Sequence, residues 1–352
     1  MASHSELVLL TGATGYLGSN VLIQLLRAGY PVRCAVRSPT KKAILLACPS
    51  IKALDGANTR LSWIMVDEMD TPGAYEKAME GATYVIHVAS PTQLSEEYPP
   101  TPENFERFFV KPAVAGTLGL LESARKTASI KRVVITSSSA AIIPFEDGAD
   151  SASQGVLNAE SRIEASKGPY TYQYAAYKAS KAMALNESEA YMKREAPRFD
   201  LISIIPTWIF GRDELVTRHD IFASLGTANA TLLAPLLGHK NDVAMNACFI
   251  YIGDIAKMHV LALDPKVPGN QAFVGSSDGI GNTRWEDMFD IVKEEFPEAV
   301  AGGRLPLGGT QPTTVIPLDA SKSEQVLGIK FVPFREQLKE VVGQYLELLT
   351  KA

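Results

Sequence analysis

The segment Thr11–Gly18 constrains the fold of this chain more than any other feature. It follows the apolar run Leu7–Leu10, and Val21, Leu22, Leu25 and Leu26 give helical periodicity after it. A glycine-rich turn between a buried strand and a helix allows a tight bend, lets a phosphate approach the backbone and lets the helix pack closely on the strand. The sequence therefore predicts a βα unit that binds a dinucleotide, with these candidate contacts: Thr11, Gly12, Thr14, Gly15, Tyr16, Leu17 and Gly18.

Apolar strands and amphipathic helices alternate as far as Pro206, which is the pattern of a parallel sheet covered on both faces. We expect an α/β fold: a Rossmann-type doubly wound parallel sheet with a smaller C-terminal substrate lobe. Residues 1–206, with 247–275 returning to them, form the predicted dinucleotide-binding domain, and 207–246 with 276–352 form the lobe. The run Phe249–Ile252 is expected to add a strand to the main sheet. The other predicted strands are 7–10, 32–36, 61–66, 84–88, 132–136 and 201–205.

The composition limits the partners of the protein. The 352 residues are 46% hydrophobic and 21% charged, with a formal net charge of -5, which argues against nucleic acid or an anionic membrane as a partner. No apolar run reaches the ~18 residues of a membrane span, and the N-terminus lacks the basic region of a secretory signal. We therefore expect a cytoplasmic protein. The three cysteines are scattered without metal-ligand spacing, so no metal is expected.

The end of the second strand indicates which dinucleotide binds. No acidic residue occurs between Tyr30 and Leu54, whereas Arg37 ends the strand and Lys41 follows it. An NAD site usually has a carboxylate here for the ribose hydroxyls, and an NADP site has an arginine for the 2′-phosphate. The predicted cofactor is therefore NADP(H). Past the third strand, either Asp67 or Glu68 could contact the adenine edge.

Two overlapping tyrosine–lysine pairs could supply acid–base chemistry. Tyr177 and Lys181 are four residues apart, and so are Tyr174 and Lys178. At this spacing both side chains share a helix face, where the ammonium can stabilise a phenolate and lower the pKa of the tyrosine. We favour Tyr177 because Ser180 precedes Lys181 and completes a Tyr-x-x-Ser-Lys pattern.

A third group is needed to hydrogen-bond the substrate oxygen. The serines 137–139 follow the predicted strand 132–136, and open α/β sheets bind ligands at the carboxyl ends of their strands. One serine hydroxyl can donate to a developing alkoxide while the tyrosine delivers a proton. The other two are expected to be turn residues.

Taken together, these motifs resemble the extended short-chain dehydrogenase/reductase family. Within it the chain is similar to the dihydroflavonol 4-reductase and anthocyanidin reductase branch, which includes yeast aldehyde and ketone reductases. The resemblance covers about residues 6–265. It rests on Thr11–Gly18, Val36–Ser38, His87–Pro91, Val110–Val114 with Gly116, Lys131–Ser138 and Pro206–Thr207.

The resemblance implies roles for individual residues. Ser138 would be the catalytic serine, Tyr177 the general acid in reduction, and Lys181 the residue that binds the nicotinamide ribose and lowers the tyrosine pKa. Arg37 and Lys41 would contact the 2′-phosphate. The residues expected to line the rest of the cofactor are Val88, Ala89, Ser90, Pro206 and Thr207.

Two departures from the family pattern leave questions open. Ser139-Ala140-Ala141 follows where the plant reductases often have Ala-Gly-Thr, so the catalytic serine could be displaced by one position. Ala113 stands where many relatives outside this branch have an asparagine of a proton relay. Either a water substitutes for that asparagine or the relay differs.

The expected function is NADPH-dependent reduction of a ketone or aldehyde on a hydrophobic, aromatic or polyketide-like small molecule, by a monomer or homodimer. A nucleotide-sugar epimerase or dehydratase is the first alternative. It is disfavoured because residues 140–143 provide neither the acid pair of the dehydratases nor the Tyr-Gly pair of the epimerases. A non-catalytic NADP-sensing module is the second alternative, but such proteins typically lose the tyrosine–lysine pair.

Overall fold

The computed structural model describes residues 5–54, 60–91, 99–144, 155–222 and 227–351 of the chain. The chain divides into two compact units. The first unit consists of Met1–Pro144, Glu160–Ile205 and Ala256–Phe273, and the second of Phe145–Ala159, Pro206–Ile255 and Val274–Ala352. Of the predicted dinucleotide-binding domain, 1–206 with 247–275, the structure groups Phe145–Ala159, Pro206, 247–255 and 274–275 with the second unit.

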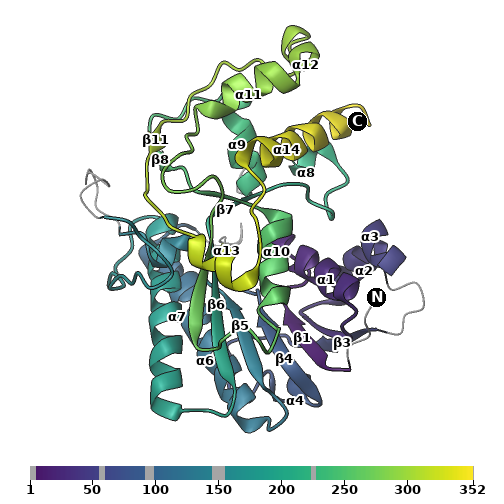
Figure 1. The fold of residues 1–352 in the computed structure, drawn as a ribbon, viewed down its shortest axis with the longest axis vertical. Helices are drawn as coiled ribbons and strands as arrows, with labels where there is room; N and C mark the ends of the chain where they lie inside the picture. Colours follow the sequence, from purple (N-terminus) through teal and green to yellow (C-terminus); the bar gives the residue numbers. More distant parts are fainter. Residues whose placement is uncertain (1–4, 55–59, 92–98, 145–154, 223–226, 352) are drawn as a thin grey trace. The chain divides into compact units, whose positions relative to one another are not determined.

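A seven-stranded sheet with the order β10-β6-β5-β4-β1-β2-β3 organises the first unit (Figure 1). The pairs from β6 through to β3 are parallel, as the alternating pattern predicts. Chain order reverses between β1 and β4, and ligands bind at such switch points in open α/β sheets. The strands are β1 (Leu7–Thr11), β2 (Val32–Val36), β3 (Leu61–Met65), β4 (Ala82–His87), β5 (Arg132–Thr136), β6 (Asp200–Pro206) and β10 (Gln271–Gly275).

Two long helices, α6 (Lys111–Lys126) and α7 (Gln173–Glu195), pack on one face of this sheet. Alternate strand residues such as Leu9 and Val133 form a buried cluster with Leu120 of α6 and Tyr191 of α7. This packing holds the C-terminal halves of the two helices against the sheet. The remaining helices before α7 are α1 (Tyr16–Ala28), α2 (Pro39–Ala47), α3 (Pro49–Leu54), α4 (Glu76–Met79), α5 (Pro102–Phe105) and the π-helix Glu106–Val110 that continues into α6.

The prediction that Phe249–Ile252 joins the main sheet is wrong. Strand β9 (Phe249–Tyr251) pairs with β7 (Trp208–Phe210) in a separate two-stranded sheet. The main sheet gains β10 instead, and α10 (Ile252–Leu261) follows β9 directly. An apolar run shows that a strand is buried, but its periodicity does not identify the strand with which it pairs.

The second unit has its own core around Trp285, which is fully buried. The rings of Phe210 and Phe249 contact the Trp285 ring in this cluster, and Phe334 stacks on Phe249. The helices are α8 (His219–Phe222), α9 (Ala228–Leu236), α11 (Asp287–Glu295), α12 (Pro297–Ala301), α13 (Ser321–Leu327) and α14 (Phe334–Leu349), and β8 (Met245–Asn246) pairs with β11 (Thr313–Thr314). A substrate-binding role for this unit stays a prediction. No described helix of the chain is long and apolar enough to cross a membrane.

Candidate active site

The glycine-rich turn at the end of β1 has the backbone geometry that the sequence predicts. Gly12 has φ +74°, in the left-handed region that favours glycine, and a Cβ there would lie 2.6 Å from the backbone nitrogen of Ala89. A Cβ on Gly18 would lie 2.0 Å from the carbonyl oxygen of Gly12, so the third glycine lets α1 pack against the turn. A Cβ on Gly15 would meet nothing closer than 3.5 Å, which leaves space beside the start of α1.

A buried hydrogen-bond chain joins this turn to the end of β4. Thr11 Oγ1 lies 2.8 Å from His87 Nδ1 and accepts a hydrogen bond from the backbone nitrogen of Ala89 at 3.3 Å. Burial lowers the pKa of His87 to about 3, and the charge of Lys181 adds to the effect, so the imidazole is neutral at physiological pH. His87 therefore positions the predicted cofactor-lining residues after β4, which the sequence analysis assigned to Val88, Ala89 and Ser90.

The predicted 2′-phosphate and adenine contacts lie at the same edge of the sheet. Arg37 follows β2 directly and is exposed, and Lys41 is exposed in the first turn of α2, which Ser38 caps. Asp67 and Glu68 are exposed just beyond β3, the neighbour of β2. The Glu68 carboxylate accepts a hydrogen bond from Thr71 Oγ1 at 3.0 Å. One of its oxygens is therefore already hydrogen-bonded within the chain, which bears on the choice between Glu68 and Asp67.

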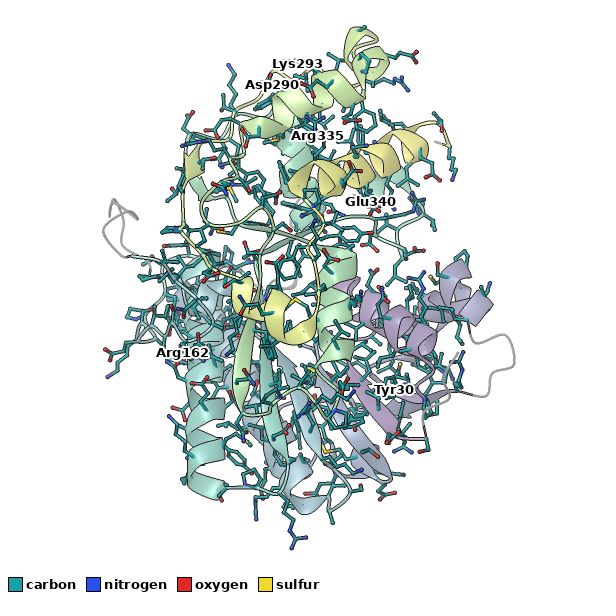
Figure 2. The ribbon with its side chains drawn as sticks, in the orientation of Figure 1. Tyr30, Arg162, Asp290, Lys293, Arg335 and Glu340 are labelled. Atoms are coloured by element: carbon teal, nitrogen blue, oxygen red, sulfur yellow. The ribbon has the colours of Figure 1, made fainter. Side chains whose placement is uncertain are left out.

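The segment that leads into α7 is tied to that helix by polar contacts. Arg162 (Figure 2) donates to both carboxylate oxygens of Glu189 at 3.1 Å, and Asn186 Nδ2 donates to the carbonyl of Ile163 at 2.9 Å. Tyr170 is buried among Phe105 and the other apolar side chains of its cluster, and donates to the Ser166 carbonyl. The polar contacts join the segment to the C-terminal half of α7, and the cluster of Tyr170 packs against Ala176 and Ala179 near the candidate tyrosines.

The two tyrosine–lysine pairs have different surroundings. Lys181 is buried, and its Nζ lies 5.8 Å from the ring centroid of Tyr177, which is half-buried. Tyr174 is 41% exposed and stacks on Tyr177 with ring centroids 6.2 Å apart. Ser180 is buried, and its hydroxyl donates a hydrogen bond at 2.6 Å to the backbone carbonyl of Tyr177 in the same helix. The structure thus brings Lys181 beside the Tyr177 ring.

The three serines after β5 have different surroundings. Ser138 lies near enough to the Tyr177 hydroxyl to lower its pKa, and its Oγ accepts a hydrogen bond from the backbone nitrogen of Ala140 at 3.1 Å. The Ser137 hydroxyl is buried without a hydrogen-bond partner and lines a cavity beside Lys181. Ser139 begins a short 3-10 helix, Ser139–Ala141. Ser138 is therefore the serine that the structure brings together with Tyr177.

The pKa of Tyr177 is shifted in the direction opposite to the one expected for the pair Tyr177 and Lys181. Burial raises the pKa of Tyr177, and the nearby Ser138 opposes this rise without reversing it. The expected lowering by Lys181 is not found, because desolvation outweighs the other influences. Burial also lowers the pKa of Lys181, to about 8. Near neutral pH the tyrosine is a phenol and the lysine is mostly an ammonium.

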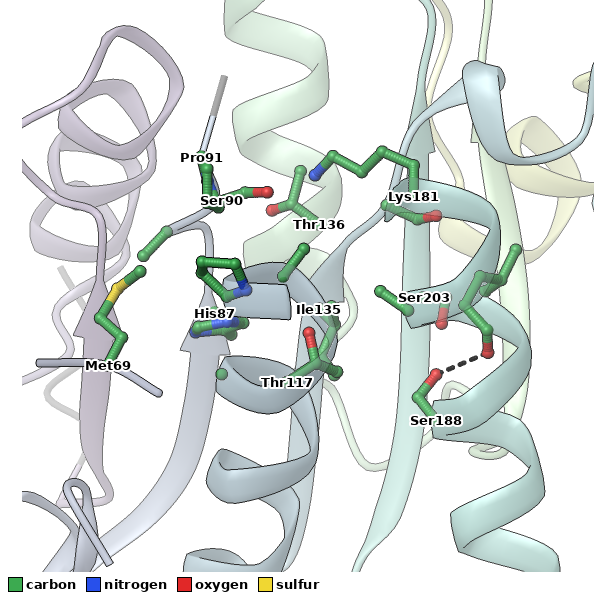
Figure 3. A pocket seen from close by; sticks show the side chains of 17 residues that line it. Met69, His87, Ser90, Pro91, Thr117, Ile135, Thr136, Lys181, Ser188 and Ser203 are labelled. Carbon is green, nitrogen blue, oxygen red and sulfur yellow. Dashed lines mark hydrogen bonds between the residues drawn. The ribbon is translucent and has the colours of Figure 1, made fainter. Parts of the chain in front are cut away.

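A small cavity extends from Lys181 toward the interior of the first unit (Figure 3). Its volume is about 20 Å³, and one water molecule needs roughly 10–15 Å³ by the same measure. Lys181, Ser137, Ala113 and Gly116 are among its lining residues. Ala113 and Gly116 leave this space because neither has a side chain longer than a methyl group. The cavity is large enough for one water molecule, which is one of the two alternatives that the sequence left open in place of an asparagine.

Two further predicted cofactor residues belong to the second unit. Pro206 is the last residue of β6, and Thr207 Oγ1 donates to the carbonyl of Gly275, the last residue of β10, at 2.9 Å. Their predicted role beside the nicotinamide stays a prediction. Within the described ranges, no group of three or more His, Cys, Asp or Glu side chains could hold a metal ion.

Known proteins share this architecture. A model of the NAD dependent epimerase/dehydratase family matches residues 8–275, which is more than half of the chain. The chain belongs to this family. Ketoreductase CTB6 of Cercospora beticola is 39% identical over 349 residues, covering 98% of this chain and 96% of that protein. The predicted extended short-chain dehydrogenase/reductase membership is thereby confirmed.

Two solved structures extend the comparison. Yeast methylglyoxal/isovaleraldehyde reductase Gre2, complexed with NADPH, is 25% identical with a TM-score of 0.78, and the match covers 98% of this chain and all of that one. Vestitone reductase from alfalfa is 21% identical with a TM-score of 0.71, covering 98% of this chain and 99% of that one, and supports the fold alone. The predicted Rossmann-type fold is confirmed, and the chain is an NADP-dependent oxidoreductase, as predicted.

Proposed function

We propose that this protein reduces a ketone or aldehyde on a hydrophobic, aromatic or polyketide-like small molecule with NADPH. The observation that carries the proposal is the assembly of Ser138, Tyr177 and Lys181 at the end of β5 and on α7. The names of a ketoreductase relative and of a reductase solved with NADPH support the same reaction. A cytoplasmic location and a monomeric or homodimeric state remain predictions.

The glycine turn fits the pyrophosphate of such a cofactor. Because Gly12 and Gly18 have no side chains, the turn packs tightly, and the start of α1 beside Gly15 is left open. Backbone N–H groups at a helix N-terminus bind phosphate oxygens well. Arg37 and Lys41 supply two positive charges near the end of β2 for the 2′-phosphate. When bound, NADPH supplies a hydride to the carbonyl carbon.

Tyr177 then acts as the general acid. Its raised pKa keeps the hydroxyl protonated near neutral pH, which suits a group that must give a proton to the developing alkoxide. Ser138 lies near the same hydroxyl and can donate a hydrogen bond to the carbonyl oxygen, so it orients the substrate. The Lys181 ammonium stabilises the phenolate that remains once the proton has been transferred.

A panel of carbonyl compounds tests the proposal directly. Purified protein mixed with NADPH and with aryl ketones, diketones or aldehydes should oxidise the cofactor only when a suitable carbonyl is present, as followed by the nicotinamide absorbance. The corresponding alcohol should accumulate in equal amount. Tight NADPH binding without turnover on any carbonyl would favour the non-catalytic sensing module instead.

We expect kcat/KM to depend on pH through Lys181, which lines the cavity. The ammonium is lost as the pH rises through about 8, so kcat/KM should fall on the alkaline side. Gly116→Ala adds a methyl group at the lining of this cavity, at ordinary contact distance, 3.7 Å from the Met69 carbonyl oxygen, and is expected to reduce the solvent that the cavity can hold beside Lys181. Greater desolvation lowers the pKa of a lysine further, so the alkaline limb should move to lower pH.

Gly119→Ala is the matched control for this experiment. Gly119 lies on the same helix, α6, and a Cβ there meets nothing within 4 Å. Both changes replace a helical glycine by alanine, which stabilises a helix by roughly 0.5–1 kcal/mol, so both variants should fold. An alkaline limb that stays in place in Gly116→Ala, or moves equally in Gly119→Ala, would contradict the role given to the cavity.

A further inference from the structure

An exposed aromatic surface begins directly beside the candidate catalytic hydroxyl. Tyr172 is 42% exposed and Tyr174 is 41% exposed, although large apolar side chains in the described parts of the chain are mostly buried. Tyr177 is half-buried and belongs to the same end of α7. Exposed apolar surface next to a reactive group commonly marks a site where a ligand binds.

The position of Tyr174 relative to Tyr177 is well defined. The two residues are three apart on α7, so their Cα atoms lie one turn apart, about 4.5 Å along the helix axis. Their rings stack with an interplanar angle of 29° and centroids 6.2 Å apart. The Tyr177 ring therefore packs against one side of Tyr174, whose side chain is still 41% exposed.

We propose that Tyr174 is a specificity-determining residue whose ring contacts the aromatic ring of an aryl ketone substrate. This inference rests on the proposed function, because it needs a carbonyl oxygen at the Tyr177 hydroxyl. A ketone held there has its carbon substituents within one helical turn of Tyr174. An aromatic ring conjugated to the carbonyl is flat, so it can lie against the tyrosine ring while the carbonyl oxygen keeps its hydrogen bond.

The electrostatics of Tyr174 suit a neutral aromatic ligand. Desolvation raises the pKa of Tyr174 to about 12, so its hydroxyl is uncharged at physiological pH. The tyrosine ring can then meet a second ring in an offset-stacked or edge-to-face arrangement. A saturated ring of the same size buries similar area but lacks the flat π surface. Tyr174 is therefore expected to favour the aryl ketone over its saturated counterpart.

A pair of substrates and three variants test this role. Acetophenone and cyclohexyl methyl ketone carry the same methyl ketone on a six-membered ring, flat in the first and puckered in the second. Tyr174→Leu keeps a bulky apolar side chain without the π surface, and should lower the ratio of kcat/KM for acetophenone to that for cyclohexyl methyl ketone about tenfold, mainly through KM. Tyr174→Phe keeps the ring and should retain the preference.

Tyr172→Leu is the control, because it removes an equally exposed tyrosine two residues away. The preference should survive in this variant. An unchanged ratio in Tyr174→Leu, or an equal loss in Tyr172→Leu, would overturn the assignment of Tyr174 while leaving the reductase function intact. A wild-type protein that reduces neither these ketones nor any other carbonyl would overturn the proposed function itself, and this inference with it.

Discussion

Tyr177→Phe is expected to reduce carbonyl turnover by about 10²–10⁴-fold, the usual contribution of a positioned general acid. The change removes only the hydroxyl near Ser138, and leaves in place the ring that contacts Tyr174 and Lys181. NADPH binding should therefore change little. Steady-state kinetics with the best carbonyl of the panel measure the first effect, and titration of the nicotinamide fluorescence measures the second.

Tyr174→Phe is the control for this experiment, since it removes the hydroxyl of the neighbouring tyrosine. It should leave the rate of the chemical step near that of the wild type. If Tyr174→Phe abolishes turnover and Tyr177→Phe does not, the pair Tyr174 and Lys178 carries the chemistry and the present assignment is wrong.

Arg37→Glu is expected to weaken NADPH binding by roughly 100-fold or more, and NADH binding far less. A charged hydrogen bond contributes about 1.5–3 kcal/mol, and the new carboxylate would also repel the 2′-phosphate. NADH has no such phosphate and gains a carboxylate near its ribose hydroxyls. Dissociation constants of NADPH and NADH are measured at one salt concentration for both proteins. The variant should raise the ratio of the NADPH constant to the NADH constant.

Arg194→Glu makes the identical substitution at an exposed arginine in the last turn of α7. It changes the net charge by the same amount and should leave both dissociation constants unchanged. Equal weakening of NADPH binding and NADH binding by Arg37→Glu would contradict the assignment of Arg37 to the 2′-phosphate. A general loss of structure or of positive charge would then explain the result.

Local signals predicted the nucleotide-binding part of the fold. The turn Thr11–Gly18 and the strands that follow could be recognised because each combines an apolar run with a distinctive neighbour in the chain. The pairing of β9 with β7, and the edge position of β10, depend on contacts between distant segments. A three-residue strand such as β9 has too little pattern to indicate its partner, and an apolar run of any length does not show its place in a sheet, so these features could not be predicted.

The candidate site was predictable in its residue types but not in its details. Two tyrosine–lysine pairs have the same spacing, and Ser180 favoured Tyr177 over Tyr174 in the sequence, whereas the different burial of the two tyrosines could be seen only in the structure. His87 was missed as a positioning residue, although a histidine at the end of an apolar strand was a visible signal. The rise in the Tyr177 pKa was also missed, because desolvation depends on the packed environment rather than on spacing.

Hydride transfer from NADPH to a carbonyl carbon is the central claim, and isotopic labelling measures it most directly. The wild-type protein is given an aryl ketone and NADPH deuterated at the transferring position of the nicotinamide. The account predicts one deuterium on the carbinol carbon of the product, in one stereochemical configuration, for each cofactor oxidised. An alcohol without deuterium, or NADPH that is bound but never oxidised in the presence of any carbonyl, would contradict it.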